Sequence, residues 1–97
     1  MKFEIAPKET EIKANWYDAK LYCFALNIGG KTGWRLPTKE ELDSIYHSEN
    51  DFVRTNHWSS TEGSGNYAWV QFMSDGSQYN ANKNFGYGYV RAVRDLS

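Results

Sequence analysis

The sequence predicts an α+β domain in which two helices flank a mainly antiparallel sheet. In the first half of the chain, apolar residues recur at helical spacing, whereas from about His57 onward they alternate with polar residues at a period of two. The chain has 97 residues, which is enough for one hydrophobic core but not for two. Residues 1–97 are therefore predicted to form a single domain.

The first half begins with a short strand and a helix. Residues 2–5 alternate weakly and predict a strand, and residues 9–13 are charged and irregular. Asn15 is predicted to cap a first helix over residues 16–26, because apolar side chains follow it at helical spacing. Gly29-Gly30 is expected to end this helix, in the role that glycine often takes at a helix C-terminus.

A second helix is predicted after Pro37, which disfavours helix in the residue before it. Thr38 and Glu41 form a T-x-x-E capping box, in which each side chain bonds the backbone amide of the other residue. Arg35 lies close enough along the chain to pair with a carboxylate on this helix. The helix is expected to bury Leu42, Ile45 and Tyr46.

The second half of the chain predicts strands. His57–Thr61 and Tyr67–Ser74 alternate and are separated by a glycine-containing loop. Asp75-Gly76 carries the signal of a tight hairpin, so Gln78–Asn82 should return antiparallel to the preceding strand. The last predicted strand is Tyr87–Asp95.

Composition excludes several classes of function. The formal charge is −1, with 11 Lys and Arg against 12 Asp and Glu, so no overall positive charge indicates binding to nucleic acid. The chain contains no apolar run of about 18 residues and no export signal, which predicts no membrane insertion and a cytoplasmic or phage-particle location. Cys23 is the only cysteine, which excludes an intramolecular disulfide and a multi-cysteine zinc site.

Short motifs in a fixed order carry a family resemblance. They are W-x-D-A at Trp16–Ala19 with Cys23 on the same helix, GWRLPT-x-x-E-L at Gly33–Leu42, HWSST at His57–Thr61, AWVQF-x-x-x-G at Ala68–Gly76 and VRAVRD at Val90–Asp95. Together they resemble the DUF1566 family, also described as the C-terminal domain of the Legionella collagen-like adhesin. The resemblance covers roughly residues 16–95.

The resemblance implies a C-type-lectin-like fold in which the N- and C-terminal strands pair and an irregular late region carries the ligand. The family is similar to modules of bacterial adhesins and phage proteins, in which binding rather than catalysis is the usual role. More distant relatives include the formylglycine-generating enzymes, which use a pair of active-site cysteines. This chain offers only Cys23, on the inward face of a helix, so the resemblance does not extend to that chemistry.

Other catalytic and metal sites have little support in the sequence. A Ser-His-Asp set of His57, Ser59 or Ser60, and Asp75 lacks the turn that positions a nucleophilic serine. His47 and His57, with Glu49 and Asp51, do not have a known spacing of metal ligands. The tripeptides by which calcium-dependent C-type lectins hold sugar are missing. We therefore predict no catalytic residue, no bound metal and no cofactor.

The stretch Ser74–Tyr89 has the composition of a recognition surface. It combines aromatic side chains with Asn, Gln, Ser and Gly, as antibody combining sites do, and the same groups suit sugars. Asn and Gly also form turns, so a purely structural role remains equally open. The candidate ligand-binding residues are Tyr67, Gln71, Gln78, Tyr79, Asn80, Asn82, Lys83, Asn84, Phe85 and Tyr87.

Three hypotheses for function follow. The first is a non-enzymatic module that binds a carbohydrate or protein receptor. The second is a free-standing phage or mobile-element protein that inhibits a host protein inside the cell, and the third is an enzyme related to the formylglycine-generating class. The expected partner is a glycan or a protein surface, and self-association into a homo-oligomer stays open. At least three of Trp16, Trp34, Trp58 and Trp69 are expected in the core.

Overall fold

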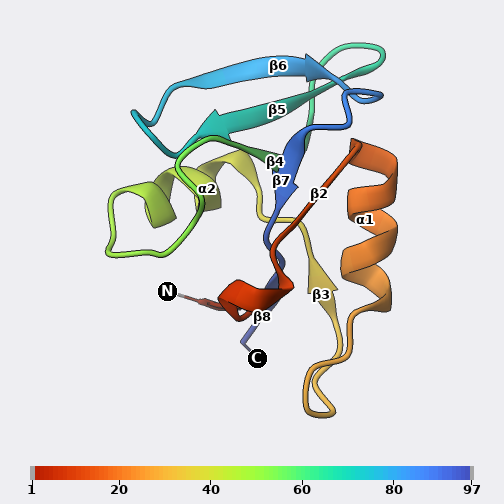
Figure 1. Cartoon of the computed structure of the whole chain (residues 1–97), viewed down its shortest axis with the longest axis vertical. Helices are drawn as coiled ribbons and strands as arrows, with labels where there is room; N and C mark the ends of the chain where they lie inside the picture. The colour runs from red at the N-terminus through yellow and green to blue at the C-terminus, as the bar shows by residue number, and fades with distance from the viewer. Residues whose placement is uncertain (1, 97) are drawn as a thin grey trace.

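The computed structural model describes residues 2–96, which form two α-helices, one 3₁₀ turn and eight strands (Figure 1). Neither α-helix is long and apolar enough to cross a membrane. In chain order the elements are β1 (Phe3–Ile5), the 3₁₀ turn η1 (Lys8–Thr10), β2 (Ile12–Ala14), α1 (Trp16–Ala25), β3 (Trp34–Arg35), α2 (Lys39–Tyr46), β4 (Asn56–Glu62), β5 (Tyr67–Phe72), β6 (Gln78–Asn82), β7 (Gly88–Val90) and β8 (Val93–Asp95).

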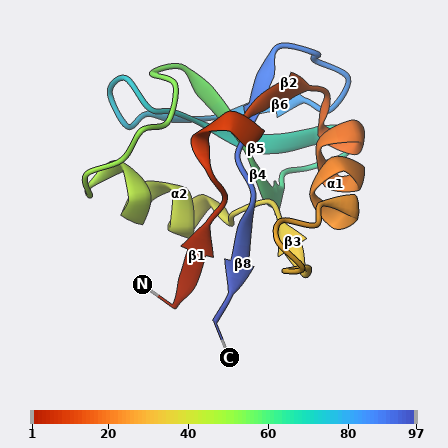
Figure 2. The same cartoon turned by 60° about the horizontal axis from the view of Figure 1, so that its bottom comes forward.

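The strands form two sheets, with the orders β1-β8-β3 and β2-β7-β4-β5-β6. Paired strands are antiparallel except β4 and β7, which meet in parallel at His57 and Tyr89. The predicted α+β class is confirmed, with its strands divided between two sheets. The predicted pairing of the chain ends is also confirmed, because Phe3 lies opposite Asp95 in β1 and β8 (Figure 2). Membership of the C-type-lectin-like class stays a prediction.

Both ends of the chain pass from one sheet to the other at the same place. The predicted last strand, Tyr87–Asp95, is interrupted at Arg91 and Ala92, so that β7 and β8 belong to different sheets. On the N-terminal side, Pro7 and η1 separate β1 from β2. Ala6 joins the two crossings, since its amide donates to the carbonyl of Ala92 at 3.0 Å and its carbonyl accepts from Arg91 Nε at 2.6 Å.

Two local predictions are wrong. The segment predicted as irregular, residues 9–13, ends in strand β2, because Ile12 and Ala14 pack against the core while pairing with β7. Helix α1 ends at Ala25, and Gly29-Gly30 does not close it. These glycines instead form the turn between Ile28 and Lys31, whose backbones bond each other.

Both predicted helix caps are confirmed. Asn15 Oδ1 accepts from the amide of Asp18 at 2.8 Å at the start of α1. At the start of α2, Thr38 Oγ1 accepts from the amide of Glu41, and Glu41 Oε1 accepts from the amide of Thr38 at 2.9 Å. These bonds satisfy amides that the helices themselves leave without partners.

Three tryptophans fill the core around α1. Each indole N–H donates to a backbone carbonyl at 2.9–3.0 Å, from Trp16 to Ser59, from Trp34 to Lys31 and from Trp58 to Ala14. Because a buried indole must find an acceptor, these bonds fix each ring in one place. Gly88 passes so close to Trp58 that a Cβ there would lie 2.2 Å from the indole nitrogen. Trp69, the fourth, is half-buried beneath Lys39 Nζ, which lies 3.8 Å from its ring centre.

A second cluster joins α2 to both sheets. Leu42 and Ile45 are fully buried against Met73, from the end of β5, and against Phe3 and Val93 of the terminal strands. Tyr46 packs at the edge of this cluster and is half-buried. The buried stripe predicted for the second helix is thus confirmed.

Arg35 ties the second helix to the C-terminal strand. Its guanidinium binds both carboxylate oxygens of Glu41, at 2.7 and 2.9 Å, and lies 2.7 Å from Asp95 Oδ1. These hydrogen bonds lower the pKa of Glu41 and of Asp95 below their ordinary values. The predicted ion pair between Arg35 and the helix is confirmed.

Replacing Arg35 with alanine should reduce the free energy of unfolding by about 1–3 kcal/mol, because a two-pronged, partly buried carboxylate contact is lost. Urea denaturation would measure this change. Arg35→Lys is the matched control, since lysine keeps the positive charge but cannot form two parallel hydrogen bonds to a carboxylate. Its free energy of unfolding should lie between those of the wild type and Arg35→Ala. A stability unchanged in Arg35→Ala would contradict the prediction.

Candidate functional site

The residues of the late aromatic stretch line a groove on the larger sheet. We call this surface the aromatic groove. It lies over β4, β5 and β6 and under the loop that leads to β7, and it encloses about 370 Å³. Its lining residues are Asn56, Val70, Phe72, Tyr79, Asn80, Ala81, Asn82 and Phe85.

Strand register creates the floor and one wall of the groove. Val70 pairs with Tyr79 and Ala68 with Ala81, and opposite residues of an antiparallel pair share one face of the sheet. Val70 is buried, and the small side chain of Ala81 leaves space above the sheet. Tyr79 and Phe72 stand at the side with their rings edge to face, 5.6 Å between centres.

The opposite wall comes from the loop after β6. Asn82 shapes this loop, because its side chain accepts from the amide of Asn84 at 2.9 Å and its carbonyl accepts from the amide of Phe85. The turn directs Phe85 to the groove, and the ring of Tyr87 meets Phe85 at 5.6 Å between centres. Two pairs of aromatic rings therefore border a floor of small aliphatic groups.

The polar groups at the groove are amides. Asn56 pairs with Phe72 and shares the groove face, whereas Asn80 and Asn82 border the groove along β6 while their side chains belong to the other face in the β5–β6 register. Within residues 2–96, no carboxylate or cationic side chain lines the groove. Apolar ring faces and neutral hydrogen-bonding groups are suited to an uncharged ligand that has both apolar and polar surfaces, such as a sugar.

The structure brings together four of the ten predicted ligand-binding residues in the groove, namely Tyr79, Asn80, Asn82 and Phe85. Tyr87 joins them through its contact with Phe85 and is 70% exposed. Asn84 is exposed on the same loop. Tyr67 is exposed, but in the β5–β6 register it belongs to the other face of the sheet, opposite Asn82.

Three other predicted residues serve the fold. Gln71 is fully buried, and its amide reaches Asp43 of α2. Gln78 donates to Gln71 at 2.8 Å and to the carbonyl of Lys39 at 2.9 Å, so this amide pair joins the sheet to α2. Lys83 is 6% exposed, bound to Glu62 at 2.6 Å and placed over the ring of Trp16. Gln71 and Lys83 are therefore buried within the fold and do not face a ligand, which corrects the prediction for these two residues.

Sequence reasoning missed Asn56, Val70, Phe72 and Ala81 as groove residues. Val70 and Phe72 are two residues apart in β5, and Ala81 is two residues after Tyr79 in β6, so the strand period gave a usable signal for these three. Asn56 enters from β4 through the pairing of Asn56 with Phe72, which only the tertiary structure supplies.

The sequence profile of the Lcl C-terminal domain family matches residues 4–94, nearly the whole chain. The chain belongs to the Lcl C-terminal domain family. This Lcl C-terminal domain is thus an adhesin-related module, and the family resemblance carried by its motifs is confirmed. Among curated proteins, none matched its sequence.

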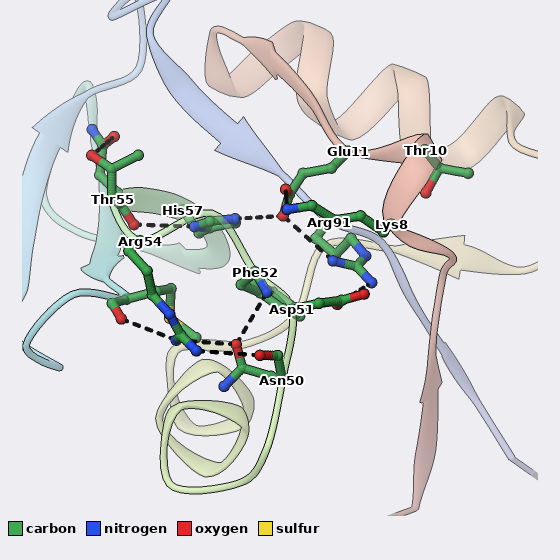
Figure 3. A network of polar contacts seen from close by, with 12 residues as sticks. Lys8, Thr10, Glu11, Asn50, Asp51, Phe52, Arg54, Thr55, His57 and Arg91 are labelled. Atoms are coloured by element: carbon green, nitrogen blue, oxygen red, sulfur yellow. Dashed lines mark hydrogen bonds and ion pairs between the residues drawn. The ribbon is translucent and has the colours of Figure 1, made fainter.

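A buried polar network lies elsewhere in this Lcl domain (Figure 3). Glu11 is its centre, and the Glu11 side chain is 3% exposed. Its carboxylate receives hydrogen bonds from Lys8 at 2.6 Å and from His57 Nε2 at 2.8 Å, and it lies 3.5 Å from Arg91 Nη1. Arg91 also donates to Asp51 at 2.7 Å.

Opposing effects act on the pKa of Glu11. Burial by itself would raise it, but the hydrogen bonds from His57 and Lys8 prevail and lower it from 4.5 to about 2. The carboxylate stays ionised and is engaged by fold partners on every side. We therefore assign this network to stability.

A hollow of about 540 Å³ adjoins this network. Lys8 and Arg91 line it together with Glu49 and Asp51, so charges of both signs meet there. Within residues 2–96, no three His, Cys, Asp or Glu side chains are placed to hold a metal ion. His57 and Asp51 are instead bound to Glu11 and Arg91, respectively.

Two candidate nucleophiles of this Lcl domain, Cys23 and Ser59, are enclosed. Cys23 is fully buried, as predicted, and burial raises the pKa of its thiol to about 12, which disfavours the reactive thiolate. Ser59 is also fully buried and donates to the carbonyl of Trp69 at 2.7 Å.

Helix α1 carries a second exposed apolar surface that the sequence reasoning did not single out. Tyr17, Leu21 and Phe24 are spaced by four and three residues, and Phe24 is 83% exposed. The opposite side of the same helix is buried through Trp16, Ala19 and Cys23. The sequence prediction of the inward side, which carries Cys23, is nevertheless confirmed.

Replacing Glu11 with glutamine should destabilise the domain by about 3 kcal/mol at neutral pH, because the buried Arg91 guanidinium loses a counter-charge. The folded-state pKa of Glu11 is lower than the unfolded value, so its contribution is present above pH 4.5 and is lost as the pH falls toward 2. The difference in stability between wild type and Glu11→Gln should therefore shrink over this interval.

Urea denaturation of both proteins from neutral to acidic pH would measure the effect. Glu9→Gln is the matched control, since Glu9 is exposed in the neighbouring 3₁₀ turn, and it should change little. A constant difference between wild type and Glu11→Gln down to pH 2 would refute the assignment.

Proposed function

We propose that this Lcl C-terminal domain is a non-enzymatic recognition module that binds carbohydrate in the aromatic groove. The observation that carries the proposal is the pairing of aromatic rings on both sides of an apolar floor, with Asn56 on the same face. Sugar rings present flat C–H faces that stack on aromatic side chains, and their hydroxyl groups bond amides.

The size and rigidity of the groove support this choice. Its volume of about 370 Å³ falls within the range usual for small-molecule sites. The walls are anchored by β5–β6 pairing and by the Asn82 turn, so little ordering is needed when a ligand binds. Membership of an adhesin-related family is consistent with surface recognition.

A protein receptor is the alternative ligand, since aromatic and amide side chains also dominate protein-binding surfaces. A phage or mobile-element protein acting on a host protein would use the same groove. A glycan array together with capture of proteins from bacterial lysate separates the two. Enrichment of one host protein that competes for the groove, with no glycan bound, would refute the carbohydrate proposal.

Tyr79→Ala and Tyr87→Ala should each weaken glycan binding by at least about tenfold, which corresponds to about 1.4 kcal/mol. Both rings are more than half exposed, so the melting temperature should change little. Calorimetric titration with the best array ligand would measure affinity, and thermal denaturation would measure stability.

Tyr17→Ala is the matched control for these variants, because Tyr17 is 45% exposed on α1 and does not line the groove. It should bind like the wild type. Unaltered binding in both groove variants would contradict the proposed site, and unfolding of both would show that these rings belong to the core.

Glycan binding should persist in the presence of a chelator such as EDTA. Calcium requires several oxygen ligands that converge on one point, usually including carboxylates, and the groove is lined by none. The measurement is the same titration with EDTA and with added calcium. An affinity that falls in EDTA and is restored by calcium would overturn this expectation.

A further inference from the structure

Strand β6 is an unusually open sheet edge. It is the outermost strand of the larger sheet in Figure 1 and has five residues, whereas the other edge strands, β1, β2 and β3, have two or three. Natural edge strands are commonly kept from pairing by shortness, charge, proline or a bulge. The sequence of β6, QYNAN, contains no charge and no proline, and its pairing with β5 is regular.

Hydrogen bonding to β5 defines which backbone groups of β6 point outward. The amide of Phe72 donates to the carbonyl of Ser77, and the amide of Lys83 donates to that of Asn66. In an antiparallel ladder every second residue faces the partner, so Tyr79 and Ala81 also face β5. The N–H and C=O groups of Gln78, Asn80 and Asn82 therefore face away from β5, although the carbonyl of Asn82 already accepts one hydrogen bond, from the amide of Phe85.

The outward edge is complementary to itself. If two copies of β6 pair antiparallel about Asn80, Asn80 meets its own copy, and Gln78 meets Asn82 of the second copy. Tyr79 then lies beside Ala81 of the second copy, which places a large side chain against a small one. No pair brings like charges together, because all five residues are uncharged.

We propose that the domain forms a symmetric dimer through β6, in which a second copy of this chain extends the five-stranded sheet to ten strands. A two-fold axis at Asn80, perpendicular to the sheet, keeps both aromatic grooves on the same face. The dimer presents two adjacent grooves to one surface. This inference rests on the strand edge and not on the ligand proposed for the groove.

Disulfide trapping tests both the interface and its register. In the proposed pairing the two copies of residue 80 have Cα atoms about 5.5 Å apart, within the range that a disulfide bridges. Asn80→Cys should form a covalent dimer with oxidised glutathione. Asn82→Cys is the matched control. In the proposed register, residue 82 of one copy and residue 82 of the other are four residues apart along the strand, or about 13 Å. This distance is too long for a disulfide, so Asn82→Cys should not cross-link. Cys23 is fully buried and should not react.

Sedimentation velocity over a range of protein concentrations gives the second test. The wild type should show a monomer–dimer equilibrium. Asn80→Pro removes an outward N–H from each copy and should raise the dimer dissociation constant at least about tenfold, whereas Asn80→Ala keeps that donor and should still dimerise. Asn80→Lys, which places like charges at the axis, gives the same test if the proline variant fails to fold.

Several results would overturn the proposal. They are a wild type that is monomeric at every concentration, folded Asn80→Cys protein that does not cross-link, and equal cross-linking through residues 80 and 82. A dimer whose dissociation constant is unchanged in both Asn80→Pro and Asn80→Lys would place the interface elsewhere. Glycan binding by a strictly monomeric protein would refute the dimer while leaving the groove proposal intact.

Discussion

The buried guanidinium of Arg91 holds the point at which both ends of the chain change sheets. Its Nε donates to the carbonyl of Ala6, Nη2 donates to Asp51, and Nη1 lies near the carboxylate of Glu11. Because a buried charge without a counter-charge is costly, the folded crossing depends on these contacts. The pairing of β1 with β8 and of β2 with β7 depends on this crossing, and β7 in turn connects the terminal strands to β4.

The crossing adjoins β2 and β7 at one edge of the larger sheet. The aromatic groove lies toward the opposite edge, on the β5–β6 hairpin and the loop that follows. The rings of Tyr79, Phe85 and Tyr87 are exposed, whereas Gln71 and Lys83, which hold the hairpin in place through Gln78 and Glu62, are buried. This separation of supporting and contacting residues lets the groove vary without loss of the fold. The open edge of β6 adjoins the same groove, so self-association and ligand binding would act on one surface.

Local chemistry predicted the parts of the fold that depend on near neighbours in the sequence. The Asn15 and Thr38 caps, the Asp75-Gly76 hairpin and the alternation of β5 follow from interactions over two to five residues. The β2 strand, the division of the last strand and the role of Gly29-Gly30 after α1 were predicted wrongly. β2 is only three residues long, and it is stabilised by pairing with β7, about 76 residues further along the chain.

The sequence by itself determined the family, the α+β class, the burial of Cys23 and of three tryptophans, and the stretch that supplies most of the groove. Only the tertiary structure decided which of the polar residues predicted to bind ligand face outward. Gln71 and Gln78 look alike in a sequence, but the packing of α2 buries the first, and Lys83 is turned inward by Glu62 and Trp16. A period of two assigns a side chain to a face of the sheet, whereas its exposure depends on what distant segments place over that face.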